Sequence, residues 1–493
     1  QVGMAVKHLS WGTHYNLLVV NTVREAFILR EHQISAHFND NVTAIQTSPT
    51  KISVYLDSEK LDPNNVSLLV SDIQVRGIFV TRENIVVWNG HRVLVYDILH
   101  DTNRFLNQGS FNVECETLVA HEKNIYTLEN LKINIRTFQG TIKQSLTLSD
   151  NEGFGLSLDI NSSFLVCATL NGCLKMWDLS RREAKSHAHP KYLSEHITNF
   201  GEVISARVNS NATKVSVLVA HSNLIPDPKL YIWDVENDVI LNFNFSSGNN
   251  DQDDSCSVPP NSARSDRGHD SKAALLKADI SGRVAVTHAW DKEEPRLMVV
   301  EARLVPGTER ADIRHQLGPG SPALPPPPGQ GQQTQANTIV VSLFVLEDQG
   351  VIVHDSSPVQ DDIVKLLALN VPHYYLLKNP NESLEDLVER KMLRDFAGLE
   401  MTDRKTKDAI VNFAIYRSIG DMDEAFKSIK SIKSTNVEAD TTSIKSVKDE
   451  DTQSVKSVKS IKSVKDEDTQ SVKSITSIKS SADDDARSIK SVS

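Results

Sequence analysis

One short pattern recurs along this sequence and restricts its fold more than any other feature. An apolar, strand-like stretch ends in an aromatic residue or a substitute for one, and aspartate follows in most copies. In chain order the copies are Tyr55-Leu56-Asp57, Tyr96-Asp97, Arg136-Thr137, Trp177-Asp178, Trp233-Asp234, Trp290-Asp291 and His354-Asp355. The first four lie about 40 residues apart, which is the length of a four-stranded WD40 blade. The pattern therefore predicts a mainly β protein, a WD40-type β-propeller of about seven blades.

The residue types also suit a blade. Alternating apolar side chains let a strand pack both faces of its sheet against neighbouring blades. The aromatic ring adds a large flat surface between sheets, and the aspartate starts the turn into the next strand. The structural blade anchors are therefore Tyr55, Tyr96, Asp97, Trp177, Asp178, Trp233, Asp234, Trp290 and Asp291. A β-sandwich that carries Trp-Asp by chance is the alternative, and the regular spacing favours the propeller.

Polar segments explain why the later copies lie further apart. Residues 246–272 are rich in Ser, Asn and Asp, and residues 306–337 are rich in Pro, Gly and Gln. Both are predicted to be disordered insertions, because they bury too little apolar area to offset their ordering entropy. The propeller is expected to span residues 1–380, and strands around Asn16 to Leu29 are expected to complete the ring.

Residues 381–433 are predicted to be helical, because the apolar period there changes from two to about 3.6. The pattern indicates one helix beginning at Ser383, a second over Lys405 to Ile419 that Gly420 ends, and a third capped by Asp421. This order is typical of a tetratricopeptide hairpin, which needs further repeats or a partner to bury its apolar face. A capping helix pair folded against the propeller is the alternative.

Residues 434–493 have a different composition. Ser-Ile-Lys and Ser-Val-Lys units alternate with acidic residues, and the string SIKSVKDEDTQSVK occurs at Ser443 and again at Ser460. Isolated Val and Ile cannot form a core, so the segment is predicted to be a low-complexity disordered tail. It is interpreted either as a phosphorylation target or as an expanded simple repeat or faulty gene model.

Charge and motifs exclude several classes of function. The net charge of -11 argues against nucleic acid and anionic membranes as partners, since phosphate binding needs clustered Lys and Arg. No apolar run approaches the ~20 residues that span a bilayer, so direct membrane insertion is not expected. The chain has no P-loop, H-E-x-x-H or G-x-S-x-G motif. His187, His189 and His196 lack Cys or carboxylate partners. We therefore expect no enzyme activity, no cofactor and no metal.

Several stretches occur in one order along the chain and carry a resemblance. They include Val87-Trp-Asn-Gly90, Glu294-Pro-Arg-Leu297 and Gly420-Asp-Met-Asp-Glu-Ala-Phe-Lys-Ser-Ile-Lys430. With these stretches the chain resembles the intraflagellar transport protein 140 family from about residue 10 to 433. Members look like two propellers followed by a long tetratricopeptide solenoid. The resemblance implies that this chain corresponds to the second propeller and the first helices. It departs from the family after Lys433, where the tail replaces the solenoid.

The resemblance also implies a function. The chain would be a non-enzymatic scaffold subunit of intraflagellar transport complex A, acting in retrograde ciliary transport, cilium assembly and entry of membrane cargo. Its partners would be the other complex A subunits, together with complex B and membrane-cargo adaptors. Its location would be the cilium, with axoneme and basal body, and the cytoplasm.

Two rival functions share the predicted architecture. Scaffolds of vesicle coats and of the nuclear pore also join a propeller to a solenoid, and only the stretches quoted above favour complex A. A propeller enzyme would need acid, base or metal-binding residues that converge at one end of the central channel. The anchors do not supply such a set.

Overall fold

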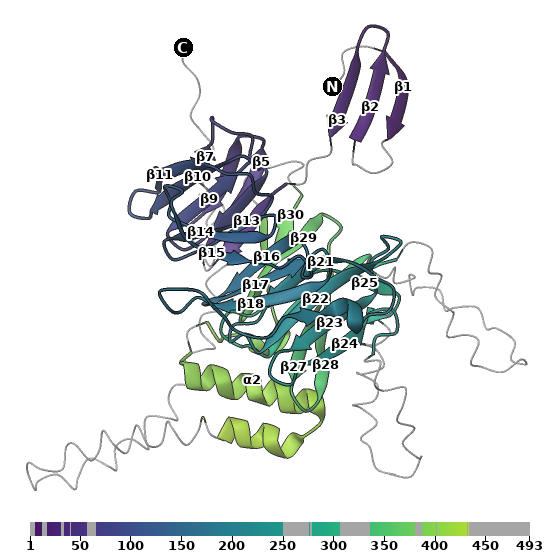
Figure 1. The fold of residues 1–493 in the computed structure, drawn as a ribbon. Coiled ribbons are helices and arrows are strands. Elements are labelled where there is room, and N and C mark those ends of the chain that lie inside the picture. Colours follow the sequence, from purple (N-terminus) through teal and green to yellow (C-terminus); the bar gives the residue numbers. More distant parts are fainter. Residues whose placement is uncertain are drawn as a thin grey trace, which may run out of the picture. The chain divides into compact units, whose positions relative to one another are not determined.

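The computed structural model describes residues 5–11, 17–30, 34–39, 41–56, 66–249, 276, 279–305, 336–379, 387–400, 402–430 and 432. Most of these residues lie in antiparallel sheets (Figure 1). The whole of the predicted tail and nearly all of the two predicted insertions lie outside the described residues, as does Asp57.

Seven sheets form the blades, and within each sheet the strands are hydrogen-bonded in chain order. Blade 1 is β4 (Ala36–Asn39), β5 (Val42–Ser48), β6 (Lys51–Tyr55) and β7 (Val66–Leu69); blade 2 is β8 (Gly77–Val80), β9 (Asn84–Trp88), β10 (Arg92–Leu99) and β11 (Arg104–Asn112). Blade 3 is β12 (Leu118–His121), β13 (Asn124–Glu129), β14 (Lys132–Arg136) and β15 (Ile142–Thr147); blade 4 is β16 (Gly155–Asn161), β17 (Phe164–Thr169), β18 (Cys173–Asp178) and β19 (Lys185–Ser186), with β20 (Lys191–Tyr192) also pairing with β18. Blade 5 is β21 (Phe200–Val208), β22 (Lys214–His221), β23 (Lys229–Asp234) and β24 (Val239–Asn244); blade 6 is β25 (Arg283–Trp290), β26 (Leu297–Leu304), β27 (Thr338–Leu346) and β28 (Gly350–Val359); blade 7 is β29 (Ile363–Asn370), β30 (His373–Lys378) and β31 (Val388–Met392). A short 3₁₀ helix, η1 (Leu193–Glu195), follows β20.

The blades close into a ring. The first strand of each blade contacts the first strand of the next, from β4 through β8, β12, β16, β21 and β25 to β29, and β29 contacts β4. Buried apolar clusters lie between neighbouring blades, as expected when both faces of every sheet are covered. The predicted fold class, a mainly β propeller with helices after it, is confirmed.

The N-terminal strands do not complete this ring. β2 (Leu17–Thr22) and β3 (Ala26–Arg30) pair with β1 (Val6–Trp11) in a separate three-stranded sheet, which pairs with no other described strand. The expectation that residues 16–29 close the propeller is therefore wrong. Blades 1 and 7 instead bury each other directly, because Phe38 and Tyr55 share one apolar cluster with Tyr375 and Leu377.

The C-terminal segment is part strand and part helix. Val388–Met392 forms β31 where a helix from Ser383 was expected, so that expectation is wrong. The 3₁₀ helix η4 (Arg394–Phe396) and the helix α2 (Arg404–Ile419) follow. The second predicted helix is confirmed by α2, whose N-cap Asp403 accepts from the Thr406 N–H and whose C-cap Gly420 has φ 93°. Residues 422–430 are helical, and Asp421 caps them by accepting from the Glu424 N–H at 3.1 Å.

The helices do not reach the dimensions of a membrane span. Among the residues that the structure describes, no helix is long and apolar enough to cross a bilayer.

Candidate functional site

The predicted anchors of blades 1 to 5 share one structural position. Each lies on the third strand of its blade: Tyr55 in β6, Tyr96-Asp97 in β10, Arg136 in β14, Trp177-Asp178 in β18 and Trp233-Asp234 in β23. Tyr55, Trp177 and Trp233 are buried, in the clusters between blades. The alternation of the strand places each of these rings between two sheets.

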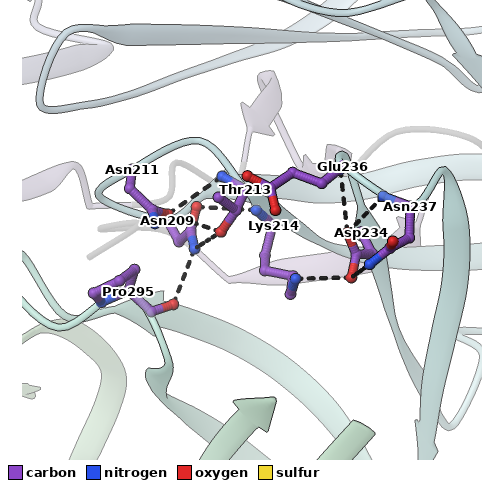
Figure 2. A network of polar contacts seen from close by, with 8 residues as sticks. All are labelled: Asn209, Asn211, Thr213, Lys214, Asp234, Glu236, Asn237 and Pro295. Carbon is purple, nitrogen blue, oxygen red and sulfur yellow. Dashed lines mark hydrogen bonds and ion pairs between the residues drawn. The ribbon is translucent and has the colours of Figure 1, made fainter. Parts of the chain in front are cut away.

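Asp234 is the most enclosed of these carboxylates (Figure 2). Its Oδ2 atom accepts from the Lys214 Nζ at 2.8 Å, and both side chains are almost fully buried, with 2% and 4% of their surface exposed. Its Oδ1 atom accepts from the backbone N–H groups of Glu236 and Asn237, which closes the β23–β24 turn. The carboxylate therefore holds β22, β23 and the following turn together within blade 5.

The same network reaches the next blade. Asn209, which has no exposed surface, accepts from the Lys214 N–H at 3.0 Å and donates through Nδ2 to the Pro295 carbonyl at 2.9 Å (Figure 2). Pro295 lies between β25 and β26 of blade 6. Burial raises the pKa of Asp234, but hydrogen bonds from Lys214 and Asn237 outweigh it and hold that pKa below its ordinary value. Asp234 is thus an ionised, paired residue with a structural role.

The aspartates of blades 2 and 4 make different contacts. Asp97 accepts from the side-chain amides of Asn84 and Gln108, each at 2.5 Å. Asp178 accepts from the Ser180 N–H at 2.8 Å, and this hydrogen bond lowers the pKa of the Asp178 carboxyl. Neither aspartate has a buried cation like Lys214, so the anchors share a position but not a set of partners.

Trp290-Asp291 occupies another position. Trp290 ends β25, the first strand of blade 6, and its Nε1 atom donates to the Arg207 carbonyl and to Ser216 Oγ in blade 5. The buried Asp291 accepts from two N–H groups of its own turn and, at 2.8 Å, from the Val371 N–H of blade 7. Burial raises the pKa of Asp291 to about 6. This pair therefore links three consecutive blades.

His354-Asp355 also lies away from the third strands, in β28, the fourth strand of blade 6. The third strand of that blade, β27, ends in Leu346 and carries no aromatic-aspartate pair. Two copies of the pattern thus lie in blade 6, and blade 7 holds none. The sequence analysis missed Lys214 as a structural residue. The signal for it is that this lysine directly precedes the apolar stretch 215–220 of one strand.

The helix α2 packs against the last two blades. Val411, Ala414 and Ile415 of α2 lie in one apolar cluster with Phe344 of β27 and Phe396 of η4. A polar contact also joins α2 to blade 6, since Arg296 donates to Asn412 Oδ1 at 3.0 Å. Figure 1 shows α2 beside β28, the strand that it contacts.

A buried histidine connects this helix to the propeller. His354 Nε2 lies 2.8 Å from Asp395 Oδ2, and its Nδ1 lies 3.0 Å from Ser342 Oγ. Asp395 is also paired with Arg417 of α2. The hydrogen bond from His354, followed by the charges of His354 and Arg417, holds the pKa of Asp395 well below its usual range. The helix α2 therefore folds against the propeller, which is the position that the alternative of a capping helix pair predicts for it.

Comparison with known protein families identifies the family to which this chain belongs. The model of the family described as IFT140 second beta-propeller matches residues 40–379. The chain belongs to the IFT140 second-propeller family. The match spans the seven blades apart from the first strand, β4, and the last strand, β31, and it confirms the resemblance seen in the sequence.

Several solved structures are distantly similar to this IFT140-type chain. Hsv2 from Kluyveromyces marxianus is 12% identical, with 73% of this chain and 100% of that chain covered and a TM-score of 0.38. A chain of the mitotic checkpoint complex is 9% identical, with 73% and 86% covered and a TM-score of 0.43. Hsv2 from Kluyveromyces lactis is 10% identical, with 72% and 99% covered and a TM-score of 0.35.

Several large apolar side chains of this IFT140-type chain are exposed, and two sets of them lie outside the seven blades. Met422 and Phe426, on the helical residues 422–430, are 42% and 57% exposed. Trp11 of β1 and Ile28 of β3 are 65% and 72% exposed. Contiguous exposed apolar patches mark surfaces that contact another protein, whereas single exposed apolar side chains occur on most protein surfaces.

Metal-binding residues do not gather in the described part of the chain. No group of three or more His, Cys, Asp or Glu side chains there could hold a metal ion. Of the three histidines considered above, His187 is exposed and lies 4.9 Å, between ring centroids, from Phe164. His189 and His196 are also exposed.

Proposed function

We propose that the chain is a non-enzymatic scaffold subunit of intraflagellar transport complex A. In this role it would serve retrograde ciliary transport, cilium assembly and the entry of membrane cargo through contacts with other complex A subunits. The family match over residues 40–379 carries the proposal, since that family is one of structural scaffolds and its complex is complex A.

The way in which α2 joins the propeller supports a scaffold. Its buried side chains share a core with blades 6 and 7, so a load on the helix passes directly into packed sheets. Met422 and Phe426 lie beyond Gly420, on the next helical segment, where they are open to a partner. In the proposed function this helical end extends the scaffold, as a tetratricopeptide start would.

Affinity purification from ciliated cells tests the proposal. The tagged chain is expected to enrich complex A subunits over subunits of vesicle coats and of the nuclear pore. The double variant Met422→Ser, Phe426→Ser is expected to lose at least one of the captured subunits, because binding through such a surface depends on a few apolar anchors.

A matched control separates this effect from surface polarity in general. Ile142→Ser removes an exposed apolar side chain, 49% accessible, from β15 of blade 3, and capture should not change. Enrichment of coat or pore subunits without complex A would reject the proposed function.

A further inference from the structure

Blades 4 and 5 expose large apolar side chains on their connecting segments. Phe154 precedes β16 and is 53% exposed, and Leu170 begins the β17–β18 turn and is 44% exposed. The Leu170 N–H donates to the Phe154 carbonyl at 2.9 Å, so the two residues are neighbours. The β22–β23 turn carries Leu224 and Ile225, which are 70% and 59% exposed. In both blades the first strand begins opposite the end of the second, so these segments lie at one edge of each sheet.

Contacts between the two blades join these segments into one surface. A Cβ added at Gly172, in the β17–β18 turn, would lie 2.5 Å from Cζ of Phe200, so the ring of Phe200 contacts that turn from blade 5. The Ser222 N–H of the β22–β23 turn donates to the Asn199 carbonyl at 3.1 Å, which places that turn beside Phe200. The blade 4–5 surface is therefore a continuous apolar area formed by Phe154, Leu170, Phe200, Leu224 and Ile225.

Leu224 is held in a conformation that leucine rarely adopts. Its φ is 63°, in the left-handed region that is strained for a bulky residue. Two hydrogen bonds fix the turn around it, from the Leu224 N–H to the His221 carbonyl at 2.9 Å and from the Ile225 N–H to Asn223 Oδ1 at 3.1 Å. Glycine would occupy this position without strain, so the turn itself does not require leucine. Strain that keeps a large apolar side chain exposed is typical of a binding position.

Acidic residues surround the blade 4–5 surface. Asp150, Glu195 and Glu202 are exposed on the connecting segments. The 3₁₀ helix η1, which holds Glu195, lies beside the β17–β18 turn, because the Leu193 N–H donates to the Gly172 carbonyl at 2.9 Å. No Lys or Arg occurs in the segments that form the surface, which are residues 148–154, 169–173, 193–202 and 221–228.

Cations at the border do not reverse this balance. Among the described residues, Lys132 of β14 and Lys229 of β23 border the surface, and they supply two positive charges against the three exposed carboxylates. Lys175 adds no free charge, because its Nζ atom lies 2.9 Å from Glu152 Oε1. The surface therefore keeps an excess of negative charge, which attracts a positively charged partner.

We propose that the blade 4–5 surface binds a segment of another protein in which large apolar side chains lie beside Lys or Arg. The apolar side chains of that segment cover Phe154, Leu170 and Leu224, and its cations pair with the surrounding carboxylates. A second copy of this chain fits less well, because it brings the same carboxylates against each other. The inference does not depend on the proposed scaffold role, since the surface lies on the blades and not on the helical residues 422–430.

Panning of a phage-displayed library of random peptides on the full chain tests this surface. The enriched peptides are expected to carry a large apolar residue beside Lys or Arg. Fluorescence polarisation then measures how tightly the most enriched peptide binds to the wild type and to each variant. Leu224→Gly should weaken binding at least about tenfold, through the loss of one central apolar contact. The same variant should melt no lower than the wild type, because glycine relieves the strain at this position.

Phe154→Ser is a second apolar variant with the same expected loss, and Leu106→Ser is its matched control. Leu106 is 54% exposed on β11 of blade 2, and its variant should bind the peptide as the wild type does. Equal binding by the wild type, Leu224→Gly and Phe154→Ser would overturn the proposed surface. So would a wild type on which no peptide is enriched.

Charge reversal tests the chemistry of the partner. The double variant Asp150→Lys, Glu202→Lys should weaken peptide binding at least about threefold at low ionic strength, and the difference should shrink as salt is added. Asp101→Lys, on the exposed β10–β11 turn of blade 2, is the control and should leave binding unchanged. Enriched peptides that carry Asp or Glu in place of Lys and Arg would contradict a basic partner.

Sedimentation velocity distinguishes another protein from a second copy. The wild type is expected to remain monomeric over the concentrations at which it binds the peptide. A concentration-dependent dimer that Leu224→Gly abolishes would assign the surface to a second copy of the chain and rule out the proposed partner.

Discussion

Blades 5 and 6 carry the same dipeptide in two different roles. Trp233-Asp234 ends a third strand, and its carboxylate stays within blade 5, on Lys214 and the following turn. Trp290-Asp291 ends a first strand and reaches outward, to blade 5 through the indole and to blade 7 through the carboxylate. The strand that carries the pair, and not the pair itself, decides whether it holds one sheet together or joins several.

The two carboxylates also differ in electrostatics. Asp234 has a buried cation, so its pKa lies below the ordinary value despite burial. Asp291 has backbone N–H donors but no cation, and burial raises its pKa to about 6. A buried charge without a counterion lowers the stability of the folded state, whereas a buried paired charge lowers it mainly when its partner is removed.

The largest effect is expected from Asp234→Asn. It leaves the Lys214 ammonium buried without a counterion, which costs about 3–5 kcal/mol of unfolding free energy. Urea unfolding measures the loss. Asp178→Asn is the control, because Asp178 has no buried cation and should lose within about 1 kcal/mol. Equal losses in the two variants would contradict the special role of blade 5.

A pH dependence is expected from Asp291. Its folded pKa of about 6 lies above the ordinary value of 3.8, so the folded state binds more protons between these values. Stability therefore falls as the pH rises from about 4 to about 6 and then levels off, by an amount on the order of 3 kcal/mol. Urea unfolding at a series of pH values, for wild type and Asp291→Asn, measures it.

The direction in which stability changes with pH tests this prediction. The stability of the wild type minus that of Asp291→Asn should decrease across that pH window. A difference that stays constant or increases would show that Asp291 ionises freely in the folded protein.

A smaller effect separates the two tryptophans. Trp290→Phe removes the indole N–H that donates to the Ser216 hydroxyl and to the Arg207 carbonyl, and we expect a loss of about 1–2 kcal/mol from these contacts. The Trp233 indole donates at 3.1 Å to Asp238, whose side chain is 70% exposed and can turn to water. Trp233→Phe should therefore lose less in chemical denaturation. The reverse order would count against the role of Trp290 as a link between blades.

The smallest effect is expected at α2. Arg417→Gln removes a partly exposed partner of Asp395, and such pairs contribute about 1 kcal/mol or less. The global stability should hardly change, but amide hydrogen exchange within α2 should become faster while β22 stays protected. Lys427→Gln, which breaks the surface pair with Glu424, is the control and should leave α2 unchanged.

Local patterns predicted much of this architecture. The spacing of Tyr55, Tyr96, Trp177 and Trp233 indicated repeated sheets, because a strand end with its turn is encoded within a few residues. The helix over 405–419 was likewise readable from its apolar period and from Gly420. The segment after Ser383 was misread, because its short apolar run fits a strand as well as a helix and the pairing of β31 with β30 decided between them.

By itself, then, the sequence determined the kind of unit, its repetition and the family. Only the tertiary structure decided which blade closes on which, which Trp-Asp pair joins neighbouring sheets and where Lys214 lies. The physical reason is distance along the chain. Ring closure between β4 and β29 joins strands that are far apart in the sequence, and no local pattern records that contact.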